Sequence, residues 1–159
     1  MGFLHQLREE QAAIRERLDA LERGLAAFHA ADHPDARALH DDTLALVQAL
    51  LPHHVHETQA LARCLAAHEG NGRAEALRRA AERVLECGQA LLEQLEDIEE
   101  DIVIPRDRLP TLGERFITVT REQLRREEQE LLDAAEDTLS AGEWRRLAKS
   151  HTGATADRG

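Results

Sequence analysis

The chain has 159 residues, of which 42% are hydrophobic and only 3% aromatic, and its formal net charge is −11 at pH 7. That length suffices for one domain with one substantial core, and the abundance of Ala, Leu, Glu, Arg and Gln predicts an all-α protein. The negative charge argues against nucleic acid or an anionic membrane as a partner, because both would repel the surface.

The first predicted helix covers residues 3–28, where apolar side chains recur in steps of three and four residues. One polar residue, Gln11, interrupts this apolar stripe between Leu7 and Ile14. The stripe therefore directs a single amide toward the core, and a buried amide needs a hydrogen-bonding partner.

The second predicted helix covers residues 34–67 and follows a break at residues 31–34. At this break Asp32 or His33 precedes a proline suited to a first helical turn. A second proline, Pro52, lies inside the helix, where it removes one backbone hydrogen bond. We expect the helix to bend or restart there.

A polar cluster follows Pro52 directly. Within it, His53 and Glu57 are four residues apart, so their side chains lie on one face of a helix at metal-ligand spacing. Gln11 lies about 19 residues before the end of the first helix, and His53 about 19 residues after the start of the second. An antiparallel hairpin with a short loop therefore places Gln11 and His53 side by side.

The third predicted helix covers residues 73–101 and follows a glycine-containing loop at residues 68–72. Counting residues from the helix ends, we expect residues 84–88 of this helix to lie at the same height in the bundle as Glu57 and Gln123. No histidine occurs there. Gly88 inside a helix costs around 1 kcal/mol relative to Ala, so we expect it to leave room for a close contact or a cavity.

The fourth predicted helix covers residues 112–134, after an irregular connection at residues 102–110. Its inward stripe is apolar except for Gln123 and Glu127, which are again four residues apart. This pair repeats the polar pair of the second helix, with Gln in the place of the histidine.

A short terminal helix is predicted after Ser140, because Ser140 and Glu143 have the spacing of a capping box. Its apolar residues Trp144 and Leu147 are expected to pack across the end of the bundle. The residues from His151 onward are predicted to be disordered.

Four long amphipathic helices joined by short loops favour an up-down-up-down bundle, formed by residues 1–150 and followed by a disordered tail at residues 151–159. Buried carboxylates are almost never left alone, since they need a cation, a metal or a proton. The polar residues that we expect to face inward near one level are Gln11, His53, Glu57, Gln123 and Glu127.

These motifs resemble those of the hemerythrin-like, or HHE cation-binding, family, whose members form a four-helix bundle that holds non-haem iron, usually as a di-iron centre. The family's first helix carries Glu-His-x-x-Ile, which residues 10–14 match except for the histidine. Its second helix carries His-x-x-x-Glu, which His53 and Glu57 match fully, and its fourth repeats this pattern, here with Gln123 in place of the histidine. The Leu-Ser-x-x-Glu-Trp segment at residues 139–144 is also similar, whereas the third-helix histidine is not found.

The resemblance implies a metal site with altered ligands. Imidazole is a strong ligand for iron and a glutamine carbonyl a weak one, so Gln11 and Gln123 make a reversible oxygen-binding di-iron centre hard to sustain. His54 or His56 compensates if the bend at Pro52 rotates one of them inward. The candidate metal ligands are His53, Glu57, Glu127, Gln11, Gln123 and His56.

Two functional hypotheses follow. In the first, the chain binds iron at a mono- or dinuclear site and has a sensing or storage role, with a metal ion or a small diatomic ligand as its partner. In the second, it binds no metal and acts as an interaction or regulatory module, with Gln11 paired to His53 and Gln123 to Glu127. Enzymatic activity is unsupported, because the Glu-x-x-His pairs of ferritin-type oxidases are absent from the inner faces.

We expect a cytoplasmic protein, with a homodimer or a protein partner as a further option. No apolar run approaches the roughly 20 residues that a membrane span needs, and the N-terminus, with Glu9 and Glu10, lacks the layout of a signal peptide. Cys64 and Cys87 have no CxxC spacing, so neither a disulfide framework nor a thiolate zinc site is predicted.

Overall fold

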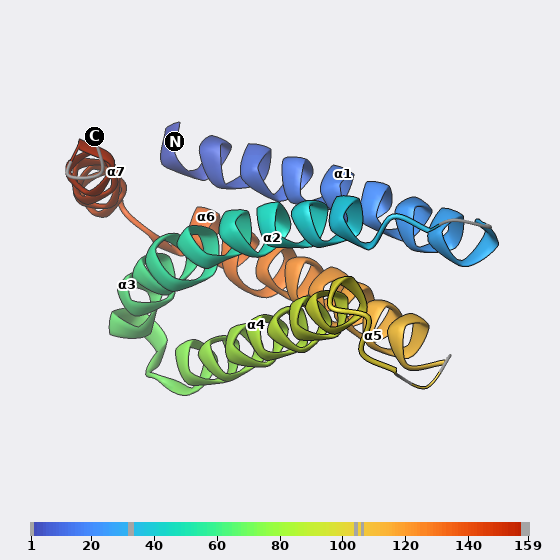
Figure 1. The fold of residues 1–159 in the computed structure, drawn as a ribbon. Coiled ribbons are helices and arrows are strands. Elements are labelled where there is room, and N and C mark those ends of the chain that lie inside the picture. The colour runs from blue at the N-terminus through green and yellow to red at the C-terminus, as the bar shows by residue number, and fades with distance from the viewer. Residues whose placement is uncertain (1, 32–33, 104, 106, 157–159) are drawn as a thin grey trace.

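A computed structural model of the chain describes residues 2–31, 34–103, 105 and 107–156, which contain helices and connections but no strand. The long helices run alternately up and down, and the last helix lies across one end of the bundle (Figure 1). This architecture confirms the predicted all-α bundle. The elements are α1 (Gly2–Ala30), α2 (Ala36–Pro52), η1 (His53–Thr58), α3 (Gln59–Glu69), α4 (Gly72–Glu99), α5 (Arg108–Arg126), η2 (Glu127–Leu132), α6 (Asp133–Thr138) and α7 (Ala141–Ala156).

The second and fourth long helices are each interrupted by a π-helical segment, η1 and η2. Segment η1 begins directly after Pro52, whose missing N–H removes one regular helical bond, and the helix continues through η1 into α3. Pi-helical turns occur mostly as single wide turns within α-helices and are frequent at functional sites. Each predicted polar pair has one residue at the start of such a turn, because η1 starts at His53 and η2 at Glu127.

The core consists of two apolar clusters with a layer of polar side chains between them. The cluster nearer α7 includes Leu7, Leu61 and Leu131. The other cluster includes Ile14 and Leu50, together with Leu124. Each long stretch that crosses from one cluster to the other passes through the polar layer, which consists of Glu10, Gln11, His53, His54, Glu57, Gln123 and Glu127.

Two helix starts differ from the sequence prediction. Helix α2 begins at Ala36, because the side chain of Asp35 caps it by accepting a hydrogen bond of 3.1 Å from the N–H of Ala38. The predicted caps Asp32 and His33 lie outside the described residues. Helix α5 begins at Arg108 and takes in Pro110, because a proline is tolerated in a first turn, where backbone N–H groups lack helical partners.

The level of α4 beside the polar layer is Leu77 and not residues 84–88, since the Leu77 carbonyl accepts a bond of 3.4 Å from Gln123 Nε2. The prediction of residues 84–88 was therefore wrong, although the connections of α4, residues 70–71 and 100–107, are no longer than the sequence predicted. Gly88 instead permits a close helix contact. A Cβ atom there would lie 2.8 Å from Val47 Cγ2 and 3.0 Å from Phe116 Cε1.

Helix α7 closes the end of the bundle near the N-terminus of α1 (Figure 1). Its capping box is confirmed, because the Glu143 N–H donates to Ser140 Oγ at 3.2 Å and the Ser140 N–H donates to Glu143 Oε1 at 3.4 Å. Trp144 and Leu147 are buried in the cluster that includes Leu7. The helix runs to Ala156, beyond the point where the sequence predicted a disordered tail, and residues 157–159 lie outside the description.

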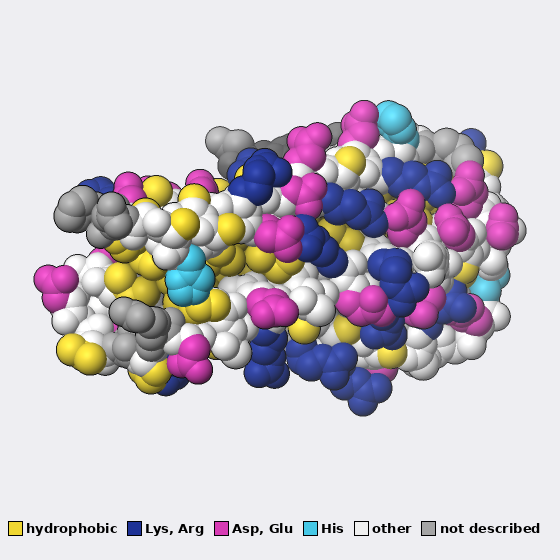
Figure 2. Space-filling model, turned by 90° about the vertical axis from the view of Figure 1, so that its right-hand side faces the viewer, with side chains coloured by type: hydrophobic (Ala, Val, Ile, Leu, Met, Phe, Trp, Pro, Cys, Tyr) yellow, Lys and Arg dark blue, Asp and Glu magenta, His cyan; other side chains and the backbone are white. Residues whose placement is uncertain are grey.

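The helices described here include none with the length and apolar composition that a membrane crossing requires. One face of the molecule, seen in Figure 2, carries acidic and basic side chains side by side, with hydrophobic side chains gathered on one half of it. Ion pairs join helices that are far apart in the sequence, since Arg121 pairs with Asp19 at 2.7 Å and with Glu22 at 2.9 Å.

Candidate metal centre

His53 is the connecting group of the polar layer. It is 2% exposed, and its two ring nitrogens face opposite sides. Nδ1 lies 3.1 Å from Glu10 Oε2 and 3.6 Å from Glu57 Oε2, whereas Nε2 lies 3.1 Å from Glu127 Oε2. One imidazole from the second long helix thus bridges carboxylates of the first, second and fourth.

Glu127 is the convergence point of the layer and is 1% exposed. Gln11 Nε2 donates to its Oε2 at 3.2 Å, and Gln123 Nε2 donates to its Oε1 at 3.3 Å. His54 Nδ1 lies 2.6 Å from the same Oε1. Among the described residues, the groups around this carboxylate are two imidazoles and two amides, without a lysine or an arginine.

The electrostatics of the layer keep one carboxylate charged and one imidazole protonated. Burial raises the pKa of Glu127, but the His54 and His53 rings outweigh it and hold that pKa well below the ordinary range of a carboxyl group. Burial lowers the pKa of His53, but hydrogen bonds with Glu10, Glu127 and Glu57 raise it well above its ordinary value of 6.5. Without a metal, a proton on His53 therefore supplies the positive charge that Glu127 requires.

The outer pair of carboxylates, Glu10 and Glu57, is unequal. Burial opposes ionisation of Glu10, yet hydrogen bonds with His53 and Glu57 lower its pKa to about 2. Burial raises the pKa of Glu57, and the neighbouring Glu10 raises it further against the effect of His53. Two close carboxyl groups resist double ionisation, so Glu10 is the anion of the pair.

Several buried polar atoms in the layer lack a hydrogen-bond partner among the described residues: Gln11 Oε1, Gln123 Oε1, His54 Nδ1 and His54 Nε2. The approach of His54 Nδ1 to Glu127 is close but outside hydrogen-bonding geometry. Native structures rarely leave buried polar atoms unsatisfied, and a bound ion is one of the usual partners of such atoms. These atoms all belong to residue types that ligate cations.

The donor atoms form two groups that suit a metal ion, and in each group the donors lie within 4.8 Å of one another. The inner group is His53, His54 and Glu127, which are all buried, and the outer group is Glu10, His53 and Glu57. Imidazole nitrogen and carboxylate oxygen suit iron, zinc and similar divalent metals. The residues present therefore fit a bound transition-metal ion.

The structure brings together five of the six candidate ligands that the sequence indicated: His53, Glu57, Glu127, Gln11 and Gln123. Gln11 and His53 lie side by side as predicted, because both contact the same oxygen of Glu127. The sixth candidate, His56, is exposed and belongs to neither donor group. The wide turn of η1 directs His54 inward instead.

Two residues of the layer were not among the predicted ligands. His54 is 0% exposed, and only Pro52 signalled that a second histidine of the cluster could turn inward. Glu10 lies at the edge of the α1 stripe, and its carboxylate oxygen lies 3.1 Å from His53 Nδ1. Its signal was the Glu-x-x-x-Ile pattern at residues 10–14. No histidine of α4 joins the layer, in agreement with the sequence.

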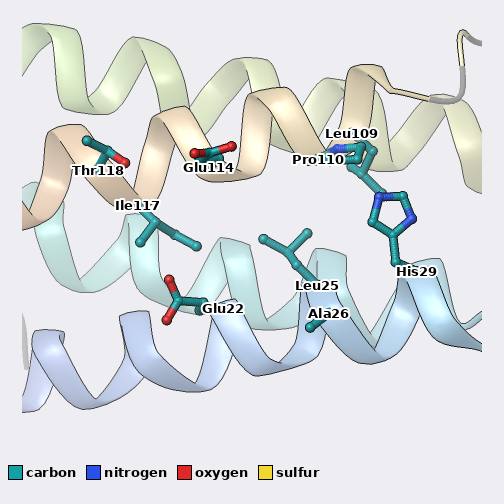
Figure 3. A pocket seen from close by; sticks show the side chains of 9 residues that line it. All are labelled: Glu22, Leu25, Ala26, His29, Leu109, Pro110, Glu114, Ile117 and Thr118. Atoms are coloured by element: carbon teal, nitrogen blue, oxygen red, sulfur yellow. The ribbon is translucent and has the colours of Figure 1, made fainter.

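A separate surface cavity of about 280 Å³ lies between α1 and α5, away from the polar layer (Figure 3). Leu25, Leu109 and Ile117 line it, and Glu22 and Glu114 lie at its edge. It contains none of the residues of the two donor groups. Both donor groups therefore lie away from this cavity.

Comparison with protein families supports the geometric result. The family model described as hemerythrin HHE cation binding domain matches residues 2–135 of the chain. Neither the curated proteins nor the solved structures gave a significant match. The matched segment spans most of the chain and contains every residue of the polar layer.

Proposed function

The chain belongs to the hemerythrin HHE cation-binding domain family, and on that premise we propose that it binds a non-haem metal ion, iron in the first instance, in the polar layer of the bundle. The observation that supports this proposal is the environment of Glu127. This buried carboxylate faces two imidazoles and, among the described residues, no lysine or arginine. A buried anion in such surroundings needs a proton or a metal ion.

The buried atoms without partners favour the metal over the proton. A proton on His53 neutralises Glu127, but it leaves both nitrogens of His54 and the amide oxygens of Gln11 and Gln123 unsatisfied. Each unsatisfied buried polar group costs about 1–3 kcal/mol. A cation beside Glu127 would provide a partner for several of them at once.

We propose that the ion serves a sensing or storage role. When bound, iron supplies Lewis acidity and one-electron redox chemistry, and with it affinity for small diatomic ligands. The chain's own residues hold and shield the ion: the two apolar clusters exclude water on either side, and Glu10 fixes the His53 ring. None of these residues is placed to act on an organic substrate, so the proposal does not include an enzymatic activity.

The alternative is a metal-free bundle that acts as an interaction or regulatory module. The hydrogen bonds of Glu127 favour it, because the amides of Gln11 and Gln123 each donate to one carboxylate oxygen without any metal. In this alternative both glutamines pair with Glu127, whereas the sequence had suggested that Gln11 pairs with His53. The glutamines would then stabilise the network in place of a metal.

Elemental analysis of protein purified without a chelator or a metal-affinity resin, together with an anaerobic ferrous titration, tests the proposal. We expect about one or two iron atoms per chain and a thermal midpoint that rises with added iron. The Glu127→Gln variant keeps the size of the side chain and removes its charge, so it should lose this iron-dependent rise. Failure of the wild-type chain to take up iron or another transition metal would establish the metal-free alternative.

A further inference from the structure

We propose that the polar layer holds a single metal ion, ligated by His53, His54 and Glu127. In this site His54 supplies a nitrogen ligand in place of the histidines that this chain lacks at positions 11 and 123. This inference rests on the proposed function and departs from the di-iron centre that the family resemblance implies. It is supported by the number of buried histidine nitrogens in the layer and by the side chain that each of them contacts.

The first step is the number of nitrogen donors. Among the described histidines only His53 and His54 are buried, and both face Glu127. The positions where the family resemblance places other imidazoles carry Gln11 and Gln123, whose amide oxygens are weak neutral ligands. The layer can therefore supply two strong nitrogen ligands, and both lie against the carboxylate of Glu127.

The second step is the tautomer of His53. A neutral imidazole carries one N–H donor and one lone pair, so it ligates one metal ion through one nitrogen. Each nitrogen of His53 lies 3.1 Å from a carboxylate oxygen, Nδ1 from Glu10 and Nε2 from Glu127. With the ion beside Glu127, Nε2 supplies the lone pair and Nδ1 keeps the proton that it donates to Glu10. Such a carboxylate partner commonly orients a metal-bound histidine.

This tautomer leaves the outer donor group incomplete. Once His53 Nε2 binds the inner ion, the outer group retains only the carboxylates of Glu10 and Glu57. Nδ1 cannot join them, because it carries a proton, which it donates to Glu10, and has no lone pair for a metal. We therefore assign Glu10 and Glu57 to positioning the His53 ring and to balancing its charge, and not to binding a second ion.

The third step is the orientation of His54. Consecutive residues of a regular α-helix point about 100° apart, so they do not share one inward site. Here η1 widens the turn, and the rings of His53 and His54 lie with centroids 5.4 Å apart and planes inclined at 59°. His54 Nδ1 lies 2.6 Å from Glu127 Oε1, so this ring faces the same carboxylate as His53 does.

Two histidines and one carboxylate, with other positions open, form the donor set typical of mononuclear non-haem Fe(II). The amides of Gln11 and Gln123 lie beside the same carboxylate, to which each donates a hydrogen bond. Their side-chain oxygens have no partner, and an amide group can exchange its N and O positions by rotation. These amides leave the site accessible to exchangeable ligands, because a neutral oxygen binds weakly.

The test uses the full chain loaded anaerobically with Fe(II). Iron stoichiometry and X-ray absorption of the wild-type complex are expected to show about one iron per chain, about two imidazoles per iron and no iron–iron scattering. His54→Ala is expected to weaken Fe(II) affinity by more than about tenfold. His56→Ala is the matched control, because it removes an exposed histidine two residues away, and it should bind as the wild type does.

The outcomes separate the two proposals. Absence of Fe(II) uptake by the wild type overturns the proposed function and this inference with it. Two irons with iron–iron scattering, or one iron with a single imidazole, overturn the inference alone. If His54→Ala does not fold, as judged by its circular dichroism, His54→Gln takes its place, and the imidazole number of the wild-type complex decides independently of either variant.

Discussion

His53 and Glu127 each occupy the first position of a π-helical segment, and the ring Nε2 of the one lies 3.1 Å from the carboxylate Oε2 of the other. The two wide turns thus face each other across the bundle at the level of the polar layer. A π turn costs regular hydrogen bonding and is frequent at functional sites. Such a turn occurs at each of the two polar motifs, so the irregular backbone coincides with the candidate site.

Replacement of Pro52 by Ala should stabilise the fold while weakening the metal site. Pro52 lacks the N–H of a regular turn and clashes with the carbonyl four residues earlier, a cost of about 3 kcal/mol in a helix interior. Pro52→Ala removes part of this cost, so we expect a higher thermal midpoint. It also favours a regular turn that directs His54 away from Glu127, so Fe(II) affinity should fall.

Pro110→Ala is the control for this substitution. Pro110 lies in the first turn of α5, where the missing N–H has no helical partner in any case. Pro110→Ala should raise the thermal midpoint less than Pro52→Ala does. It should leave the Fe(II) affinity unchanged. Equal effects of the two variants would show that η1 does not depend on Pro52.

Glu127→Ala should destabilise the metal-free protein by about 3–5 kcal/mol, the usual cost of removing one partner from a buried charged network. The substitution leaves the amide donors of Gln11 and Gln123 and the ring of His53 without their acceptor. Urea denaturation in the presence of a chelator measures the effect.

The neighbouring residue provides a matched control. Glu128 makes a partly exposed ion pair of 2.8 Å with Arg15, and such pairs contribute about 0–1 kcal/mol. Glu128→Ala should therefore shift the urea midpoint only slightly. Similar shifts for the two variants would contradict the assignment of Glu127 as the centre of the polar layer.

The periodicity of the sequence was sufficient for the bundle and for most of the polar layer. The apolar stripes locate the long helices, and the four-residue spacings place His53, Glu57, Gln123 and Glu127 on inward faces. The π turns could not be predicted, because a pattern read at 3.6 residues per turn contains no sign of a locally wider turn. The inward position of His54 depends on that wider turn.

Level matching from the helix ends placed Gln11 beside His53 but failed for α4. The connections of α4, residues 70–71 and 100–107, led to residues 84–88, whereas the structure places Leu77 beside Gln123. Glu10 lies beside the stripe of α1, and only its contact with His53 across the helix pair reveals its role.

Gly88→Ala should destabilise the bundle although Ala is the better helix former. The new methyl group would lie 2.8 Å from Val47 Cγ2 and 3.0 Å from Phe116 Cε1. Overpacking of this kind costs about 1–3 kcal/mol, which exceeds the propensity gain of around 1 kcal/mol. Gly142→Ala in α7 meets no atom closer than 3.8 Å, so it should be neutral or stabilising. The denaturation midpoints of the two variants are expected to move in opposite directions or by clearly different amounts.

The docking of α7 should weaken in acid because of Glu143. A hydrogen bond from His68, followed by those from Cys64 and Ser140, outweighs desolvation and lowers the pKa of Glu143 to about 2 from its ordinary value of 4.5. A carboxyl group whose pKa is lower in the folded state binds its proton more readily when unfolded. Its contribution to stability is therefore fully present above about pH 4.5 and is lost as the pH falls toward about 2.

Trp144, the single tryptophan, reports on this contact, because it is buried in the cluster that α7 forms with α1. Glu143→Gln keeps an oxygen that can accept the Ser140 hydrogen bond but removes the charge that His68 binds at 2.9 Å. We expect the difference in stability between wild type and variant, measured by Trp144 fluorescence, to be constant above about pH 4.5 and to shrink below it. Glu86→Gln serves as the control, since Glu86 lies on α4 beside Leu112 and Arg115, and its stability difference should not follow this course. A wild-type advantage that persists unchanged to about pH 2 would show that the charge of Glu143 does not hold α7 in place.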